Sequence, residues 1–213
     1  MEFIDEKIES YALAHSQPES DVLKKLNRET HLKVMSPRML SGHLQGNFLS
    51  MISKMIRPKQ ILEIGTYTGY SAICLAQGLQ DGGKLHTIDN NEQLEKMTRS
   101  FFDQAGLKDK IHFYIGDAST VIPTIKEQFD IVFIDADKKN YSLYYDMVFD
   151  AVRKGGYIIA DNVLWSGKIL DTQKNNDRET VLIDEFNKKV HSDARVEHQL
   201  IPIRDGLMIA KKL

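Results

Sequence analysis

The sequence predicts a doubly wound α/β fold, a mostly parallel sheet with helices on both faces, preceded by a helical N-terminal extension. Three features lead to this prediction. Short apolar segments alternate with amphipathic helices after Pro58, a glycine-containing turn follows the first apolar segment, and acidic residues follow several later ones. Apolar segments separated by helix-length stretches are typical of parallel strands joined by βαβ units. We therefore expect one domain over residues 1–213, with residues 1–57 as the helical extension.

Periodicity predicts helices in the extension. Apolar residues from Phe3 to Leu13 recur near the helical period, and a Ser-Gln-Pro break follows them. Asp21 could cap a second helix. A third should run from about Ser41 to Ile56, because the residue before Pro58 is disfavoured in a helix.

Seven strands are expected after the extension. The first five should be parallel, and the last two, joined by a tight Arg204-Asp205-Gly206 turn, should form an antiparallel hairpin at one edge. The expected strands are Gln60–Gly65, Lys84–Ile88, Ile111–Ile115, Asp130–Ile134, Tyr157–Ala160, Val196–Ile203 and Leu207–Lys211.

Composition excludes several classes of protein. The formal net charge of −2 gives no broad positive surface for nucleic acid. The single cysteine, Cys74, cannot form an internal disulfide and suits a reducing compartment. The sequence has neither a membrane-length apolar run nor a signal-like start, so we expect a cytoplasmic protein without a membrane partner.

The run Ile61-Leu-Glu-Ile-Gly-Thr-Tyr-Thr-Gly-Tyr-Ser71 indicates a ligand-binding turn. Gly65 at the strand tip lets a ligand approach the backbone, and the helix that opens at Ser71 offers unpaired N–H groups. Glu63 disfavours a diphosphate and favours a ligand with a positive charge and free hydroxyl or amino groups. This points to S-adenosylmethionine rather than NAD. The alternative is a tight turn without a ligand.

Acidic residues also follow the second and third strands. Asp89 could accept hydrogen bonds from both ribose hydroxyls of an adenosine ligand. Asp117 and Ala118 lie where the adenine ring would be expected. The alternative for both aspartates is that they only cap the helices that follow.

The fourth and fifth strands, which should be neighbours, predict a metal site. Asp135 follows one strand, and Asp161 and Asn162 follow the other, so three hard oxygen ligands could serve Mg²⁺, Mn²⁺ or Ca²⁺. Lys138 would lie beside the metal and could act as the general base for a phenolic proton. The alternative is a pair of helix caps with a surface lysine.

Together these motifs resemble the cation-dependent catechol and caffeoyl-CoA O-methyltransferases, which are class I S-adenosylmethionine enzymes. The most specific strings are Phe133-Ile-Asp-Ala-Asp-Lys138 and Asp161-Asn162-Val-Leu-Trp-Ser-Gly167. The resemblance implies a Rossmann-like methyltransferase sheet, Asp135, Asp161 and Asn162 as metal ligands with Mg²⁺ favoured, and Lys138 as the base. It implies cofactor contacts at Glu63, Gly65, Thr66, Ser71, Asp89, Ala118 and Asp135.

Two further strings refine the resemblance. Met39-Leu-Ser-Gly-His-Leu-Gln-Gly46 is similar to the animal catechol enzymes and places Met39 and Ser41 near the methionine moiety. Pro202 stands where the catechol branch has a glutamate that holds the second hydroxyl, as in the caffeoyl-CoA branch.

The expected substrate is therefore a small hydroxylated aromatic molecule, and the family implies a homodimer. Some bacterial relatives methylate 5-hydroxyuridine in tRNA, and the basic residues Lys24, Lys25, Arg28, Lys33 and Arg38 could contact phosphate. A non-catalytic S-adenosylmethionine-binding protein is a second alternative. The intact Asp135, Lys138, Asp161 and Asn162 argue against it.

Overall fold

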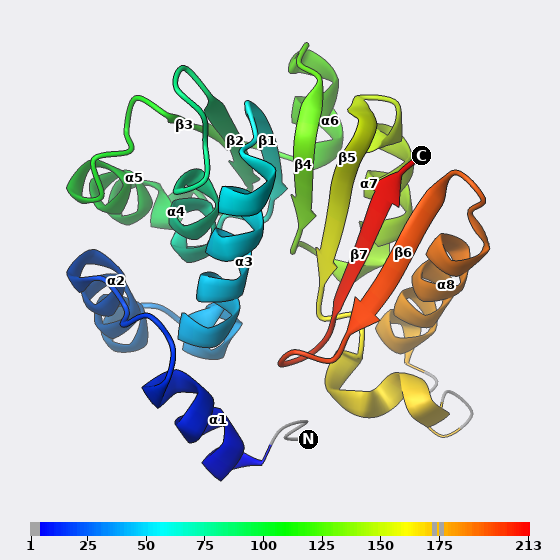
Figure 1. Ribbon diagram of the computed structural model, residues 1–213, viewed down its shortest axis with the longest axis horizontal. Helices are drawn as coiled ribbons and strands as arrows, with labels where there is room; N and C mark the ends of the chain where they lie inside the picture. The colour runs from blue at the N-terminus through cyan, green and yellow to red at the C-terminus, as the bar shows by residue number, and fades with distance from the viewer. Residues whose placement is uncertain (1–4, 172–173, 175–176) are drawn as a thin grey trace.

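A computed structural model describes residues 5–171, 174 and 177–213. Its centre is a seven-stranded sheet in the order β3-β2-β1-β4-β5-β7-β6 (Figure 1). The strands β1 to β5 are parallel, and β7 runs antiparallel between β5 and β6. The strands are β1 Gln60–Ile64, β2 Lys84–Asp89, β3 Ile111–Ile115, β4 Phe129–Ile134, β5 Val152–Asp161, β6 Val196–Ile201 and β7 Leu207–Lys212.

Helices cover both faces of the sheet because the strands are apolar on both sides. Ile61 packs in a core with α2 to α5, whereas the next residue, Leu62, packs in a second core with α6 to α8. The helices are α1 Glu6–Ala14, α2 Asp21–Lys33, α3 Gly42–Ile56, α4 Tyr70–Ala76, α5 Glu95–Gln104, α6 Ala118–Val121, α7 Tyr141–Phe149 and α8 Arg178–Ser192. The predicted α/β fold is confirmed.

Some details of the predicted elements are wrong, including the end of β6 at Ile201 instead of Ile203. Strand β5 begins at Val152, before the predicted Tyr157, because a register shift against β4 accommodates the intervening charged and glycine residues. The cap of α2 is Ser20, whose hydroxyl accepts a hydrogen bond from Leu23 N, and Asp21 is the first helical residue. The start of the first predicted helix, including Phe3, lies outside the described residues.

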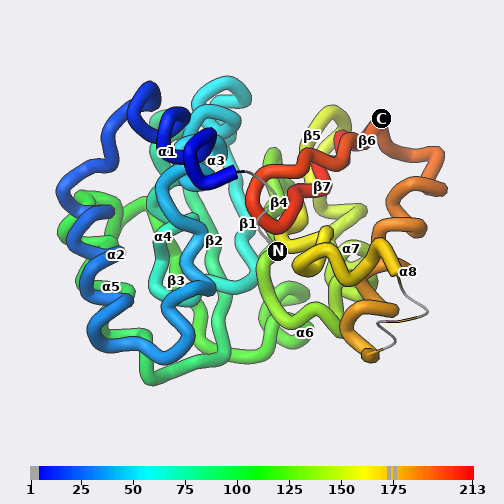
Figure 2. The backbone as a smooth tube through the Cα atoms, turned by 90° about the horizontal axis from the view of Figure 1, so that it is seen from below, coloured from blue at the N-terminus to red at the C-terminus, as the bar shows by residue number. Residues whose placement is uncertain are grey.

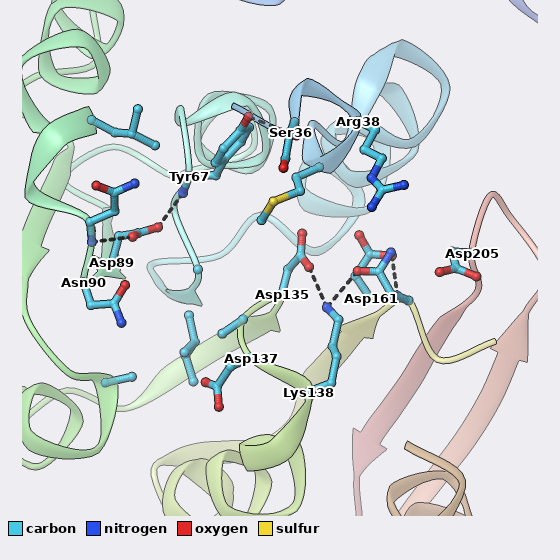
Figure 3. Close-up of a pocket in the computed structure, with 18 of the residues that line it drawn as sticks. Ser36, Arg38, Tyr67, Asp89, Asn90, Asp135, Asp137, Lys138, Asp161 and Asp205 are labelled. Atoms are coloured by element: carbon cyan, nitrogen blue, oxygen red, sulfur yellow. Dashed lines mark hydrogen bonds and ion pairs between the residues drawn. The ribbon is translucent and has the colours of Figure 1, made fainter. Parts of the chain in front are cut away.

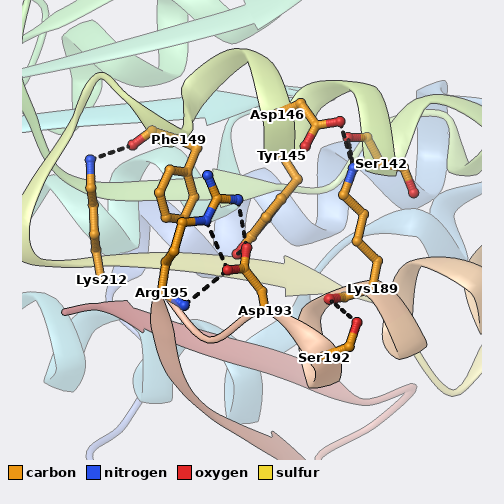
Figure 4. Close-up of polar contacts among 9 residues, drawn as sticks. All are labelled: Ser142, Tyr145, Asp146, Phe149, Lys189, Ser192, Asp193, Arg195 and Lys212. Carbon is orange, nitrogen blue, oxygen red and sulfur yellow. Dashed lines mark hydrogen bonds and ion pairs between the residues drawn. The ribbon is translucent and has the colours of Figure 1, made fainter.

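The edge hairpin is attached to α7 by a polar cluster (Figure 4). Asp193 accepts hydrogen bonds from Arg195 Nη2 at 2.7 Å and from the Tyr145 hydroxyl at 3.0 Å. The Arg195 guanidinium holds the pKa of this carboxyl well below its usual range. Lys212 of β7 also donates to the Phe149 carbonyl at 2.8 Å. The cluster fixes one end of the hairpin against the main sheet.

The other end of the hairpin lies where the parallel strands end. Figure 2, seen from below, shows α1, the β6–β7 turn and the segment after β5 in front of the sheet. These segments therefore surround the carboxyl ends of the strands, the edge at which open α/β sheets bind ligands. Within the described ranges, no helix combines the length and apolar character needed to cross a bilayer.

Candidate active site

A cleft of about 1790 Å³ opens at the carboxyl ends of the parallel strands. Residues that directly follow each of β1 to β5 line it, together with the segment between α2 and α3 and the β6–β7 turn. Of the residues predicted to bind ligands, the cleft is lined by Met39, Gly65, Asp89, Asp117, Ala118, Asp135, Lys138, Asp161 and Asn162.

The side chains of Asp135, Lys138 and Asp161 lie close together between β4 and β5 (Figure 3). The two strands pair in parallel, so Asp135 and Asp161 lie at the same edge, as predicted. Lys138 Nζ donates hydrogen bonds to Asp135 Oδ1 at 3.1 Å and to Asn162 Oδ1 at 2.8 Å. One ammonium group thus forms an ion pair with Asp135 after β4 and a hydrogen bond with Asn162 after β5.

Asp161 is the deeper of the two carboxylates, with only 2% of its surface exposed. Gln45 Nε2 of α3 donates to its Oδ2 at 2.5 Å, and the backbone N–H of Asn162 donates to its Oδ1 at 2.7 Å. Burial raises the pKa of Asp161, and the nearby negative charge of Asp135 raises it further. The carboxylate is therefore held in a fixed orientation at an energetic cost that a bound cation would reduce.

Tyr141 supports this cluster and was not identified from the sequence. Its buried hydroxyl accepts a hydrogen bond from Lys138 Nζ at 2.6 Å and donates to the Asp161 carbonyl at 3.0 Å. It therefore links the lysine to the tip of β5. The sequence did contain one indication of this contact: Tyr141 follows Lys138 by three residues at the start of a helix, a spacing that places side chains side by side. Gln45 had none, because it lies 116 residues from its partner Asp161.

Asp89 organises the turn after β1. Its Oδ2 accepts hydrogen bonds from the backbone N–H groups of Thr66 at 3.0 Å and Tyr67 at 2.7 Å, and its Oδ1 accepts from Asn91 N at 2.9 Å. The carboxylate therefore fixes two loops while still lining the cleft. Helix capping by Asp117 is also present, since Ser119 N donates to it at 2.7 Å.

Four residues predicted to contact the cofactor are not among those lining the cleft: Ser41, Glu63, Thr66 and Ser71. Glu63 is fully buried, and its carboxyl accepts hydrogen bonds from Ser71 Oγ at 2.6 Å and Thr87 Oγ1 at 2.5 Å. Burial raises the pKa of Glu63 to about 8, against the opposing effect of these hydrogen bonds. Glu63, Thr66 and Ser71 belong to the β1–α4 region, and Ser41 directly precedes α3. Contact of all four with a ligand stays a prediction.

The fold itself requires glycine at position 65, apart from any access for a ligand. Its φ is +100°, and a Cβ there would lie 1.8 Å from the backbone carbonyl oxygen of Asp135. Only glycine lets the tips of β1 and β4 approach this closely. The turn and the Asp135 backbone are therefore packed directly against each other.

The metal site stays a prediction. Within residues 5–171, 174 and 177–213, no group of three or more His, Cys, Asp and Glu side chains is arranged to hold a metal ion. The predicted donor set contains two carboxylates and one amide oxygen.

Comparison with known proteins identifies the family of the chain. Residues 13–213 match a family model described as O-methyltransferase. Caffeoyl-CoA O-methyltransferase of Stellaria longipes is 32% identical, covering 92% of this chain and 85% of its own length. The enzyme of that name from Petroselinum crispum is 34% identical with the same coverage.

Solved structures give the same result. The O-methyltransferase from Bacillus cereus, in complex with SAH, has a TM-score of 0.87 and 29% identity, covering 97% of both chains. The O-methyltransferase TomG from Streptomyces achromogenes, in complex with SAM, has a TM-score of 0.90 and 26% identity, covering 97% of this chain and 96% of its own. A cleft at the strand ends and a family match over nearly the whole chain lead to one conclusion: this protein belongs to the S-adenosylmethionine-dependent O-methyltransferases.

Proposed function

We propose that the protein is a divalent-cation-dependent enzyme that transfers the methyl group of S-adenosylmethionine to a hydroxyl of a catechol-like or caffeoyl-type small molecule. The observation that carries the proposal is the convergence of Asp135 and Asn162 on one ammonium group, with the carboxylate of Asp161 beside them. The relatives that carry the name caffeoyl-CoA O-methyltransferase support the class of acceptor.

The chemistry of the donor set fits a hard dication. Two carboxylates and an amide oxygen are ligands that Mg²⁺, Mn²⁺ and Ca²⁺ accept, and Mg²⁺ is our first choice. Both oxygens bond one ammonium group, at 3.1 and 2.8 Å from Lys138 Nζ, which supports the proposal that they could also bind one dication. A dication held there would lower the pKa of the reacting hydroxyl.

The chain's own residues supply positioning and a proton acceptor. Asp89 would hold the ribose hydroxyls, and S-adenosylmethionine would supply the methyl group. Lys138 Nζ, once it has lost one proton to solvent and become a neutral amine, would accept the proton of the acceptor hydroxyl in place of one of its present contacts. Tyr141 keeps that nitrogen beside the reacting groups. Alignment of two bound reactants can contribute on the order of 7–11 kcal/mol to the lowering of the barrier.

Metal dependence can be tested by removal and replacement. We expect activity on catechol or caffeoyl-CoA to disappear in EDTA and to return with Mg²⁺ or Mn²⁺. Asp161→Asn should weaken Mg²⁺ binding in calorimetry and abolish turnover, while leaving S-adenosylmethionine binding largely intact. The matched control is Asp137→Asn, the same chemical change at a cleft residue whose carboxylate bonds Tyr144 and Asn140 instead. Full activity in the chelator would contradict the proposal.

The tRNA alternative has less support. On α2, Lys24 and Lys33 form ion pairs with Asp21 and Glu29, and Lys25 donates to Gln104. These lysines therefore form a solvated helix face with local partners. Undermodified tRNA belongs in the same assay panel, where methylation of it in preference to catechols would favour this alternative. The predicted homodimer is tested by size-exclusion chromatography with light scattering.

A further inference from the structure

We infer that Arg38 recognises an anionic group, a carboxylate or a phosphate, on the acceptor substrate. The inference rests on the proposed function, since it concerns the acceptor side of the same cleft. It adds a substrate class: dihydroxylated aromatic molecules that carry a negative charge away from the ring, in preference to neutral catechols.

The first observation is that Arg38 has no partner among the described residues, whereas the other basic residues lining the cleft do. Lys138 donates to Asp135, Tyr141 and Asn162. The remaining three cleft cations, each with its partner, are Lys33 with Glu29, Lys168 with Asp177, and Arg204 with the Leu40 and Ser41 carbonyls. A positive charge left unpaired in a cleft is available to a ligand.

The second observation is that the backbone around Arg38 is fixed. Pro37 restricts φ at the preceding position. The Tyr67 hydroxyl donates to the carbonyls of Met35 at 3.2 Å and Ser36 at 3.3 Å, and Arg204 Nη1 donates to that of Leu40 at 2.9 Å. The segment is thus held on both sides of Arg38. A cation on a fixed backbone loses less entropy when it binds a ligand than one on a mobile loop.

The third observation is the direction of the side chain. Figure 3 shows the Arg38 guanidinium directed into the cleft on the side of Asp161 and Asp205, away from Asp89, where the ribose is expected. The carboxylates on this side already have donors, because Gln45 bonds Asp161 and the Ser166 N–H bonds Asp205 at 2.5 Å. The guanidinium therefore faces the acceptor side of the cleft, and no carboxylate in the described part of the chain is paired with it.

A planar guanidinium suits this role. Its N–H groups form a fork that matches the two oxygens of a carboxylate or phosphate, and such charged hydrogen bonds are among the stronger polar contacts. The reacting hydroxyl must lie beside Asp135 and Asp161, so an anionic group elsewhere on the acceptor could reach Arg38 at the rim. The contact would orient the ring and raise affinity for charged acceptors.

The experiment compares three acceptors that share one dihydroxyphenyl group. Caffeate carries a carboxylate, caffeoyl-CoA carries phosphates without a free carboxylate, and methyl caffeate is neutral. Dissociation constants are measured by calorimetry with Mg²⁺ and SAH present, for the wild type, Arg38→Gln and Arg28→Gln. Arg28 is the matched control, because both arginines are exposed and only Arg38 lines the cleft.

We expect Arg38→Gln to weaken the binding of an anionic acceptor by about 10–100-fold relative to that of methyl caffeate. This is the usual loss of affinity when a charged hydrogen bond is removed. Weakening of caffeate alone identifies a carboxylate site, and weakening of caffeoyl-CoA alone identifies a phosphate site. Any of three results would overturn the inference. Arg38→Gln could change the affinity for all three acceptors equally, or Arg28→Gln could have the same effect as Arg38→Gln. The wild type could also bind neither anionic acceptor more tightly than methyl caffeate. Turnover by the wild type is measured separately, so its failure would refute the proposed function without deciding the role of Arg38.

Discussion

Removing the Tyr141 hydroxyl should loosen the cluster between β4 and β5. Tyr141→Phe keeps the buried ring and leaves no cavity, but it removes an acceptor from Lys138 Nζ and a donor from the Asp161 carbonyl. A hydrogen bond to a charged group contributes about 1.5–3 kcal/mol and a neutral one about 0.5–1.5 kcal/mol. We therefore expect the free energy of unfolding to fall by about 2–4 kcal/mol, which a domain of ordinary stability survives.

Urea denaturation followed by circular dichroism measures this change. The control is Tyr144→Phe on the same helix, which removes a hydrogen bond to Asp137 rather than one to Lys138. A double-mutant cycle with Lys138→Met isolates the part of this free-energy change that depends on the contact between Tyr141 and Lys138. We expect a coupling energy of about 1–3 kcal/mol. Because the lysine is repositioned, kcat should also fall while the affinity for S-adenosylmethionine stays close to the wild-type value. Additive effects in the cycle, together with unchanged kcat, would refute the role assigned to Tyr141.

Three other predictions follow from the same edge of the sheet. Asp89→Ala should weaken S-adenosylmethionine binding by about 1.5–3 kcal/mol for each charged hydrogen bond lost; an unchanged dissociation constant in calorimetry would contradict the assignment. Gly65→Ala should lower the melting temperature far more than Gly82→Ala, since both have positive φ but a Cβ at Gly82 meets nothing within 4 Å. The pKa of Glu63 rises from 4.5 to about 8 on folding, so the native state binds the extra proton in that window. The free energy of unfolding of the wild type should therefore fall relative to that of Glu63→Gln as pH rises from about 4.5 to 8, by at most about 1.4 kcal/mol per pH unit. Denaturant unfolding of both proteins measures this. If the difference between their free energies of unfolding did not change with pH, Glu63 would not be buried and protonated.

The pairing of β4 with β5 illustrates what local sequence could predict. Each strand is a short apolar run followed by an acidic residue, and the carboxyl ends of neighbouring parallel strands meet at one edge. The juxtaposition of Asp135 with Asp161 could therefore be predicted before the structure was known. The turn Arg204-Asp205-Gly206 likewise predicted the hairpin of β6 and β7, which the structure confirms.

The position of a residue along its strand did not predict whether its side chain lines the cleft or is buried in the core. Glu63 lies two residues before Gly65, which made it a candidate for the cleft, yet its side chain points into the protein and bonds Ser71 and Thr87. Successive side chains of a strand point to opposite faces of the sheet, and Glu63 is on the face where α4 packs and Ser71 reaches it.

The sequence alone thus determined the strand–helix alternation and the residues that end each strand, because both depend on local periodicity and turn chemistry. Only the tertiary structure decided the insertion of β7 between β5 and β6 and the hydrogen bond from Gln45 to Asp161. These features join segments far apart in the chain. Their geometry depends on how the helices pack on the sheet, and no local pattern of residues encodes that packing.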